Sequence, residues 1–430
     1  MKPVLQVALD FLNLKRALAV AEEAVAAGVS WIEAGTPLIK SEGLNSIRVL
    51  RKKFPKATII ADMKTMDVGR IEAEAAAKAG ADIISVLGLS SDSTIRECVE
   101  AGKNYGIKVE VDLIEVKESQ IEKRARKIQE LGVDYISVHC PIDEQMQGKD
   151  PFSRLRKVAK AVSIPVACAG GINSQTAHLA VKAGASIVIV GGAVTKAKNP
   201  KQAAKAIQKV ITTGRAIKSE YFKRVSFSGV REVLMKVSAA NLSDALHRSG
   251  DLKEIHPLFK GIKMVGRALT VRTYPGDWAK TVEAIDCAQA GDVLVIDAGG
   301  VGPAVWGELA TCAALNRKLS GIVVDGAVRD TSQIRKLRFP VFSKLITPTA
   351  GEPKGFGEIG VCVKISGIRV CSGDWIVGDD DGVVCIPEDR AVEVANRAMS
   401  ILEQENRLRE EINKGSTLGK VIELLKWEKK

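Results

Sequence analysis

The chain has 430 residues, of which 46% are apolar, and a formal net charge of +12. This length suggests two or three domains with sizeable cores, and the sequence has no uncharged run of about 18 residues that could span a membrane. Only 4% of the residues are aromatic, and the basic residues are spread over predicted helix surfaces. The composition therefore argues against nucleic acid and membranes as partners and favours phosphorylated small molecules.

The N-terminus and the cysteines predict a cytoplasmic protein. The first four residues lead directly into an apolar strand and leave no room for a signal peptide. The eight cysteines include no C-x-x-C pair, and we expect reduced, buried thiols. Those that lie inside apolar segments are Cys168, Cys287, Cys312, Cys362 and Cys385.

Short apolar segments alternate with alanine-rich helical segments over the first two hundred residues. Their nearly continuous hydrophobicity is typical of parallel strands that are buried on both faces. Helical periodicity follows each strand, for example over 13–27 and 71–79, and several helices end on glycine. The expected strands are 4–10, 31–36, 58–64, 82–88, 108–114, 135–140, 165–171 and 187–192.

Eight such units predict a closed (β/α)8 TIM barrel over residues 1–212. In this fold the active site lies at the C-terminal ends of the strands. The third strand ends in the run 62–67, and because a strand alternates its faces, Asp62 and Lys64 point the same way. Such charges are costly unless they pair with each other, with a metal or with a charged ligand. The other polar residues at strand ends are Asp10, Glu33, Asp112 and His139.

Several of these residues also have a purely structural interpretation. Asp10 could cap the first helix, and the run 62–67 could be a solvated ion pair in a loop. His139 could be a core histidine, although a strand-end position opposite carboxylates makes it a better base. Glu33 has no obvious capping role, and Asp112 remains unassigned. So many polar residues at matching strand ends predict an active site.

Two pairs of glycines follow strands seven and eight. They are Gly170-Gly171 and Gly191-Gly192. Paired glycines let backbone N–H groups approach a phosphate, and these two strand ends are where barrels usually bind one. We therefore expect a phosphate site there, although Gly191-Gly192 could also serve only as a tight turn.

Four motifs of this half occur together in one known group of barrels. Residues 1–212 resemble the orotidine-5′-phosphate decarboxylase suprafamily and, within it, the 3-hexulose-6-phosphate synthases. The related 3-keto-L-gulonate-6-phosphate decarboxylases carry an arginine three residues after the histidine, where this chain has Ile142. This difference favours the synthase. The motifs are Ala8-Leu9-Asp10, Ile32-Glu33-Ala34-Gly35-Thr36, Asp62-x-Lys64-x-x-Asp67 and His139.

The resemblance implies a reversible aldol condensation of formaldehyde with D-ribulose 5-phosphate to D-arabino-3-hexulose 6-phosphate. It implies a divalent ion, Mg²⁺ or Mn²⁺, and hard oxygen ligands make Glu33 and Asp62 the candidates. His139 would remove the proton from C1, and Lys64, kept charged by Asp62 and Asp67, would hydrogen-bond the enediolate. Asp10 belongs to the same catalytic set. In the suprafamily the last aspartate of the motif, here Asp67, reaches the neighbouring subunit's site, which implies a dimeric barrel.

The pattern changes after the barrel. Residues 213–229 are predicted to form a partly helical linker, and residues 230–430 a second α/β domain with an inner β layer. We expect a helix near 238–246 that is capped by Ser or Asn, and a helix over 306–316. The expected strands are 266–274, 291–298, 321–324, 361–366, 368–370, 374–377 and 383–386.

The second domain carries one chemical candidate. The loop 299–302 precedes a predicted helix and could bind an anion through Gly300 and Gly302. Arg329 could bind a carboxylate, and Asp330 could hold a metal together with Glu308. The alternative is a structural turn with an Arg–Asp pair at the surface.

This half resembles the family shared by the regulator of ribonuclease E activity A and the class II pyruvate aldolases. Aldolases of this family have an acid, twenty residues, then Arg-Asp; here the acid is Glu308, where an aspartate is typical. The resemblance implies pyruvate-type lyase or oxaloacetate decarboxylase chemistry, or else a ribonuclease regulator or an oligomerisation module. It also implies trimers or hexamers. The motifs are Ser243-Asp244-Ala245-Leu246, Gly291-Asp292-Val293-Leu294, Trp306-Gly307-Glu308-Leu309, Gly326-Ala327-Val328-Arg329-Asp330 and Gly373-Asp374-Trp375.

Overall fold

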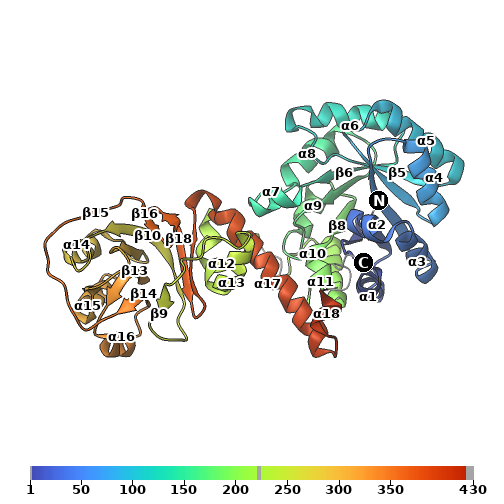
Figure 1. Cartoon of the computed structure of the whole chain (residues 1–430). Helices are drawn as coiled ribbons and strands as arrows, with labels where there is room; N and C mark the ends of the chain where they lie inside the picture. The colour runs from blue at the N-terminus through green and yellow to red at the C-terminus, as the bar shows by residue number, and fades with distance from the viewer. Residues whose placement is uncertain (1, 220–223, 423–430) are drawn as a thin grey trace. The chain divides into compact units, whose positions relative to one another are not determined.

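The computed structural model describes residues 2–219 and 224–422 (Figure 1). These residues form two compact units. The first unit contains residues 2–145, 149–219, 224 and 403–422, and the second contains 146–148 and 225–402. This division departs from the expected ranges, because the segment from residue 403 onward groups with the first unit and residues 146–148 group with the second.

The first unit is a closed barrel of eight parallel strands in sequential order, in which β8 pairs with β1. The predicted TIM barrel is therefore confirmed. Each strand is slightly shorter than expected, except the third, which extends to Thr65. The strands are β1 (Val4–Leu9), β2 (Trp31–Ala34), β3 (Thr58–Thr65), β4 (Ile83–Leu87), β5 (Lys108–Asp112), β6 (Tyr135–His139), β7 (Val166–Ala169) and β8 (Ile187–Val190).

Helices surround the strands of this barrel (Figure 1). Asn13 caps α1 by accepting a hydrogen bond from the N–H of Arg16, and glycines with positive φ end α4, α5 and α11 at Gly80, Gly106 and Gly214. The helices are α1 (Leu14–Val25), α2 (Thr36–Glu42), α3 (Asn45–Lys53), α4 (Gly69–Ala79), α5 (Asp92–Tyr105), η1 (Glu118–Gln120), α6 (Ile121–Glu130), α7 (Ile142–Met146), α8 (Phe152–Ala161), α9 (Ala177–Lys182), α10 (Gly192–Thr195) and α11 (Pro200–Thr213).

Two apolar layers hold the barrel together. The larger lies between strands and helices and includes Val7, Ile32 and Leu50, all fully buried. The smaller fills the inside of the barrel with side chains such as Ile60, Ala167 and Ile187. The interior is thus a packed core, and polar side chains gather only where the strands end.

The second unit contains one mixed sheet in the order β19-β18-β10-β11-β13-β14-β9. Strands β10, β11, β13 and β14 are parallel, and β18, β19 and β9 add antiparallel edges. The strands are β9 (His256–Pro257), β10 (Met264–Arg272), β11 (Val293–Asp297), β12 (Ala304–Trp306), β13 (Gly321–Val328), β14 (Val341–Ile346), β15 (Glu358–Ile359), β16 (Val363–Ile365), β17 (Ile368–Val370), β18 (Trp375–Asp379) and β19 (Gly382–Ile386).

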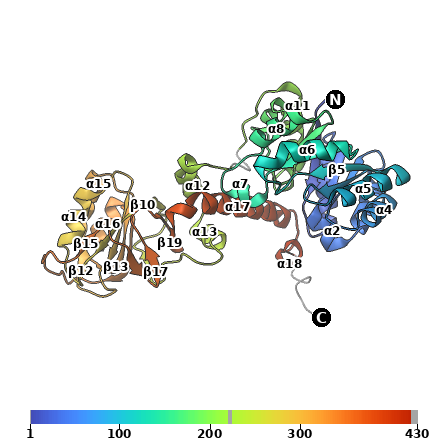
Figure 2. The ribbon, with the colours of Figure 1, turned by 90° about the horizontal axis from the view of Figure 1, so that it is seen from above.

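Helices α14, α15 and α16 cover one face of this sheet (Figure 2), and the β16–β17 hairpin packs on the other. The predicted inner β layer is confirmed, as is the cap of α13, where Ser238 and Asn241 form a capping box. The helices are η2 (Phe227–Gly229), α12 (Val230–Lys236), α13 (Ala239–Ala245), α14 (Ala279–Cys287), α15 (Glu308–Asn316), α16 (Thr331–Leu337), η3 (Glu388–Arg390), α17 (Ala391–Asn413) and α18 (Leu418–Val421).

The order of the elements after the glycine loop differs from the expectation. The loop 299–302 leads into strand β12, not directly into a helix, and α15 begins only at Glu308. Strand β14 was not expected. The predicted linker 213–229 is partly helical as expected, since Thr213 ends α11 and residues 227–229 form η2; residues 220–223 lie outside the described residues. The N–H of Ile217 donates to the carbonyl of Ser174 in the barrel at 2.9 Å.

The cysteines also differ from expectation. Cys362 and Cys371 form a disulfide, Cys287 is exposed and Cys312 is half-buried. Cys168 and Cys385 are buried thiols, as predicted. No helix within residues 2–219 and 224–422 is long and apolar enough to cross a membrane.

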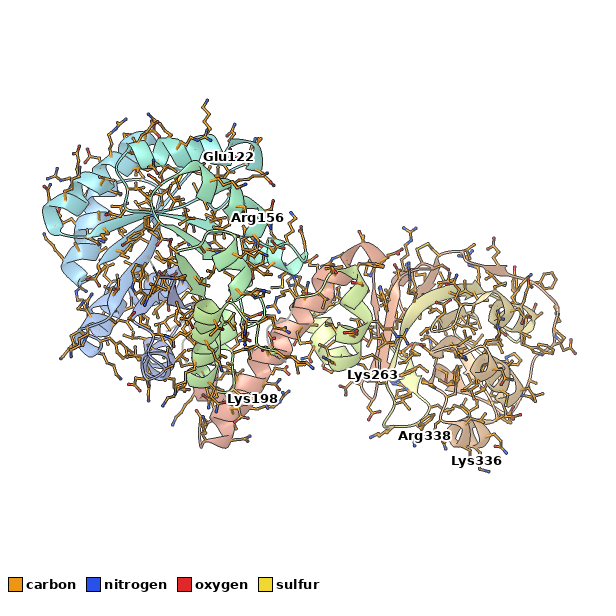
Figure 3. The ribbon with its side chains drawn as sticks, turned by 180° about the vertical axis from the view of Figure 1, so that it is seen from behind. Glu122, Arg156, Lys198, Lys263, Lys336 and Arg338 are labelled. Atoms are coloured by element: carbon orange, nitrogen blue, oxygen red, sulfur yellow. A yellow bond between two sulfur atoms is a disulfide. The ribbon has the colours of Figure 1, made fainter. Side chains whose placement is uncertain are left out.

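Charged side chains on the outer helices project into solvent. Glu122 on α6 and Arg156 on α8 are exposed on the barrel, and Lys336 on α16 is exposed on the second unit (Figure 3). The positive charge is thus distributed over helix surfaces, as the sequence suggested.

Candidate active site

A cavity of about 610 Å³ opens at the C-terminal ends of the barrel strands. Every strand contributes to its lining, because inward-facing residues alternate along each strand. The predicted residues that line it are Asp10, Glu33, Asp62, Lys64, His139, Gly170, Gly171, Gly191 and Gly192. The barrel therefore brings together residues that are up to 182 positions apart, the separation between Asp10 and Gly192 (192 − 10).

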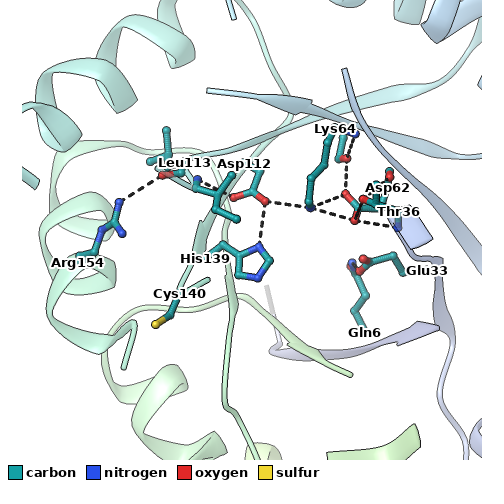
Figure 4. A network of polar contacts seen from close by, with 12 residues as sticks. Gln6, Glu33, Thr36, Asp62, Lys64, Asp112, Leu113, His139, Cys140 and Arg154 are labelled. Carbon is teal, nitrogen blue, oxygen red and sulfur yellow. Dashed lines mark hydrogen bonds and ion pairs between the residues drawn. The ribbon is translucent and has the colours of Figure 1, made fainter. Parts of the chain in front are cut away.

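Asp62 and Lys64 form the centre of this site (Figure 4). The ammonium of Lys64 lies 2.9 Å from both carboxylate oxygens of Asp62. Asp62 also accepts hydrogen bonds from the hydroxyls of Thr36 and Ser85, each at 2.6 Å. The carboxylate is thus held in one orientation by donors from three different strand ends, and the pair is a buried ion pair, not a solvated loop contact.

Lys64 also approaches Asp112, whose Oδ2 atom lies 3.4 Å from its ammonium. Burial opposes the charged form of Lys64, but Asp62, Asp112 and Glu33 outweigh burial and raise its pKa. Lys64 is therefore a permanent cation in this site. Its backbone has φ = +48°, and the β3–β4 register shifts between Ala61 and Thr65, so a local bulge directs this side chain into the cavity.

His139 is the second partner of Asp112. Its Nδ1 atom lies 3.1 Å from Asp112 Oδ2. Burial alone would lower the pKa of His139, but the charge and hydrogen bond of Asp112 raise it. The same contact holds the pKa of Asp112 at about 2 against the effect of burial. With Nδ1–H donating to Asp112, Nε2 is left as the acceptor that a general base needs.

Asp10 and Glu33 complete a group of carboxylates with Asp62. Burial and the negative charge of Asp62 raise the pKa of both. Gln6 donates a hydrogen bond to Glu33 at 2.6 Å. Asp10 is an exposed residue that lines the cavity, and it does not cap α1, since Asn13 does. The capping alternative for Asp10 is therefore wrong.

This carboxylate group fits a divalent cation of the magnesium type. A cation would relieve the repulsion that raises the pKa values of Asp10 and Glu33, and Mg²⁺ typically takes one or two carboxylates plus water and substrate oxygens. Within the described residues no three His, Cys, Asp or Glu side chains form a complete metal site. Glu33 and Asp62 would thus supply only part of a coordination shell.

The glycine pairs follow β7 and β8 as predicted, and part of their role is structural. A Cβ atom on Gly170 would lie 2.5 Å from the carbonyl oxygen of Cys140, and Gly170 has φ = +106°. On Gly191 a Cβ atom would lie 3.1 Å from Asp10 Oδ2. Close packing therefore already requires small residues here, and phosphate binding stays a prediction.

Asp67 does not join the cavity of its own chain. It is exposed, and its carboxylate accepts from the neighbouring N–H of Val68. Within its own chain Lys64 has Asp112 as its second carboxylate partner, and the role of Asp67 at the site of a neighbouring subunit stays a prediction. Ile142 is exposed and lines the cavity at the position where the decarboxylases carry arginine.

Several residues of the site were not expected from the sequence. Asp112 was expected at this end of the barrel, but not its role, which is to join Lys64 to His139. Glu110 lies fully buried below it, and burial raises its pKa to about 7. The only sequence feature that these residues share is a strand position that faces the interior of the barrel. The other additions to the lining are Gln6, Thr36, Ser85, Ser137, Gln145, Lys196 and Gln404.

In the second unit the structure brings together the end of β12 and the end of β13. The Oδ2 atom of Asp330 accepts from the N–H of Glu308 at 3.1 Å and lies 3.6 Å from Nε of Arg329. A Cβ atom on Gly307 would lie 2.6 Å from the same oxygen, so a larger residue here would displace the Asp330 carboxylate. Arg329 and Asp330 are both about 40% exposed, so the surface-pair alternative remains open.

The glycine loop 299–302 of this unit has fewer free backbone N–H groups for binding an anion than expected. The N–H of Gly299 donates to Asp297, and that of Gly300 donates to the carbonyl of Asp325. Two of its N–H groups therefore already have partners within the protein. Anion binding by Gly300 and Gly302 stays a prediction.

Comparisons with known proteins agree with this geometry. Residues 3–207 match the model of the "Orotidine 5'-phosphate decarboxylase / HUMPS family". A 3-hexulose-6-phosphate synthase from Bacillus subtilis (strain 168) is 39% identical over 211 residues, which are 49% of this chain and 99% of that protein. The chain belongs to this family through its barrel.

Other matches extend this result. A 3-hexulose-6-phosphate synthase from Mycobacterium gastri is 40% identical over 207 residues, 48% of this chain and 99% of that protein. Residues 239–385 match the "Aldolase/RraA" family model, so the second half is an RraA-like domain. A solved structure of the RNA-processing inhibitor RraA from Thermus thermophilis is 29% identical and covers 36% of this chain and 94% of that one, with a TM-score of 0.34.

The contact between Asp112 and His139 predicts that removing the charge of Asp112 changes the pKa of His139 measurably. Asp112→Asn removes the charge that stabilises the imidazolium, so the pKa of His139 should fall. The chain has only four histidines, and NMR titration of their ring protons can follow His139 directly. Asp286→Asn, which changes an exposed aspartate on α14 of the second unit, should leave the titration unchanged. An unchanged pKa of His139 in Asp112→Asn would contradict the geometry.

Proposed function

We propose that the barrel condenses formaldehyde with D-ribulose 5-phosphate to D-arabino-3-hexulose 6-phosphate, and that it also catalyses the reverse reaction. The observation that carries this proposal is the chain of contacts from Asp62 through Lys64 and Asp112 to His139. It places a fixed cation beside a base in one cavity, which is what an enediolate needs. The synthases of Bacillus subtilis and Mycobacterium gastri support the same reaction.

The reaction begins with removal of a proton. His139 Nε2 takes a proton from C1 of the ketose, while Asp112 stabilises the imidazolium that forms. The electron pair of the broken C–H bond moves towards the C2 carbonyl oxygen, and Lys64 donates a hydrogen bond to the enediolate. Because Lys64 is held by two carboxylates, it need not reorganise as this charge develops.

The carbon–carbon bond forms in the second step. C1 of the enediolate attacks the carbon of formaldehyde, the C2 carbonyl is restored, and the former aldehyde oxygen takes the proton back from His139. No redox partner is required. Glu33 and Asp62 would hold a divalent ion, Mg²⁺ or Mn²⁺, which when bound polarises the carbonyl and neutralises the oxyanion.

Ile142 supports the synthase over the 3-keto-L-gulonate-6-phosphate decarboxylase. It presents an apolar side chain to the cavity, where an arginine would supply a charge for a carboxylated or more polar substrate. The decarboxylase remains the second candidate for the barrel, because its expected site otherwise contains the same residues. The phosphate of either substrate would bind near the glycine pairs.

We also propose that the barrel is a dimer in the cytoplasm. Asp67 is exposed beside apolar side chains that are themselves more than half exposed, namely Met66, Val68 and Ile71. Such an apolar surface next to a charged residue is typical of a contact with a second chain. Asp67 would then reach the site of the partner subunit.

Variants of the barrel test the proposed reaction. In the full-length protein with Mg²⁺ and ribulose 5-phosphate, wild type should consume formaldehyde, and EDTA should stop it. His139→Ala should lower kcat about 10²- to 10⁴-fold because the base is lost, and Lys64→Ala about 10²- to 10³-fold because the enediolate loses its donor.

Lys78→Ala is the matched control, since the contacts of Lys78 with Glu74 and with the ring of Tyr105 lie outside the cavity and their loss should change little. Full activity in Lys64→Ala would refute the mechanism. If the wild type releases CO2 from 3-keto-L-gulonate 6-phosphate faster than it consumes formaldehyde, the decarboxylase is the better assignment.

For the second unit we propose a metal-dependent lyase of the pyruvate type, such as an oxaloacetate decarboxylase. Asp330 and Glu308 would hold the ion, and Arg329 would bind the substrate carboxylate in a bidentate manner. The close approach of these groups around Gly307 supports this assignment. The alternative is a non-catalytic module that regulates a ribonuclease or assembles the chain into trimers or hexamers.

Two substitutions separate these possibilities. Arg329→Ala and Asp330→Ala should each abolish Mg²⁺-dependent pyruvate release from oxaloacetate, and Asp330→Ala should also weaken Mg²⁺ binding measured by calorimetry. Lys336→Ala, an exposed change on α16, should behave as wild type. If neither variant changes metal binding or pyruvate release, the domain is not catalytic.

A further inference from the structure

The cavity of the barrel is lined by one residue from far along the chain. Gln404 lies on α17, more than 190 residues after the last barrel helix ends at Thr213, and it lines the cavity together with Lys196 and the Gly191-Gly192 pair. The family match of the barrel ends at residue 207 and that of the second domain at 385. Gln404 therefore belongs to neither matched region.

The segment that carries Gln404 is bound to the barrel along its length. Glu403 pairs with Arg224 at 3.8 Å, and the two side chains are only 4% and 9% exposed. One turn further on, buried Arg407 donates to the carbonyl of Lys198 at 3.4 Å. A buried ion pair is often no more stabilising than apolar packing. We therefore interpret these charged contacts as fixing the position of the segment on the barrel and not as a main source of folding stability.

The far end of the segment is fixed as well. Arg407 pairs with Glu411 at 3.0 Å, and Glu411 pairs with Arg16 of α1 at 3.3 Å. Arg16 in turn donates to the carbonyl of Val421 at 3.3 Å. The segment 403–421 is thus held at both ends by charged residues, through its contacts with Arg224 and the Lys198 carbonyl at one end and with Arg16 of α1 at the other.

Several charged side chains surround Lys196, which lines the cavity together with the glycine pair. Lys196 lies partly buried at the cavity edge, and burial together with the nearby Arg224 lowers its pKa, while Glu403 and Asp10 oppose that change. Glu403 therefore supports the charged form of Lys196 next to Gly191-Gly192. An ammonium, an amide and backbone N–H groups at one end of a cavity are donors suited to a phosphate.

We propose that the C-terminal segment of this chain is part of the barrel's substrate site, where Gln404 and Lys196 bind the phosphate of the sugar phosphate and Glu403, paired with Arg224, positions them. This inference rests on the proposed function for the identity of the sugar, but phosphate recognition can be tested without it. It makes the second half of the chain a contributor to substrate binding, because the polypeptide must pass through that domain before it returns to the barrel.

Two substitutions in the full-length protein test the inference. Gln404→Glu keeps the size of the side chain and places a negative charge at the phosphate end, so the Kd for inorganic phosphate, measured by calorimetry, should rise at least tenfold. Lys196→Met should raise it by a similar factor. For turnover with formaldehyde, both should raise KM for ribulose 5-phosphate and leave kcat within about threefold.

Matched controls lie close to the two substituted positions. Glu405→Gln changes a half-buried residue of α17 that pairs with Arg409, and Lys201→Met removes an exposed lysine of α11, five positions beyond Lys196. Both should bind phosphate as wild type does. The melting temperature of each variant, measured by calorimetry, shows whether a change comes from loss of the fold.

The outcomes separate the inference from the proposed function. If wild type consumes formaldehyde and Gln404→Glu and Lys196→Met keep the wild-type Kd and KM, the inference is refuted and the proposed function stands. If wild type consumes no formaldehyde but both variants lose phosphate binding while the controls keep it, the inference stands and the function is refuted. A loss of kcat with unchanged KM and Kd would also refute the inference.

Discussion

The ammonium of Lys64 is the interaction on which the barrel's site depends. It lies between Asp62 and Asp112, at 2.9 and 3.4 Å, in a cavity that also contains Asp10 and Glu33. Two unit charges about 4 Å apart interact by about 4 kcal/mol at an effective dielectric of 20, so without this cation the carboxylates would repel one another strongly. The same cation is fixed before any substrate arrives, which is the condition for stabilising an enediolate without reorganisation.

Much of this arrangement could be predicted from the sequence, because side chains alternate between the two faces of a strand. The alternation of a strand places Asp62 and Lys64 on one face, and parallel strands deliver Glu33 and His139 to the same edge. The role of Asp112 could not be predicted, because its partners lie 27 and 48 residues away and only closure of the barrel brings them together. Asp67 lies outside the cavity of its own chain, and its reach into the site of a neighbouring subunit stays a prediction.

The missed features share one physical cause, namely dependence on tertiary partners. The β16–β17 hairpin pairs Val363 with Val370, which sets Cys362 opposite Cys371, but nine residues of spacing do not reveal that register. Strand β12 exists because β13 pairs with it, so the glycine loop before it resembles the start of a helix. The end of α17 is amphipathic and polar, and no pattern in its sequence predicts that it packs on the barrel.

The central claim is that His139, oriented by Asp112 and assisted by Lys64, removes the C1 proton of a ketose phosphate. The most direct test is proton exchange in D₂O, with Mg²⁺, wild-type protein and ribulose 5-phosphate but no formaldehyde, followed by NMR of the C1 protons. The account predicts that one of the two C1 protons is replaced by deuterium, and that His139→Ala abolishes the exchange. Sugar phosphate that binds but retains both C1 protons would contradict it.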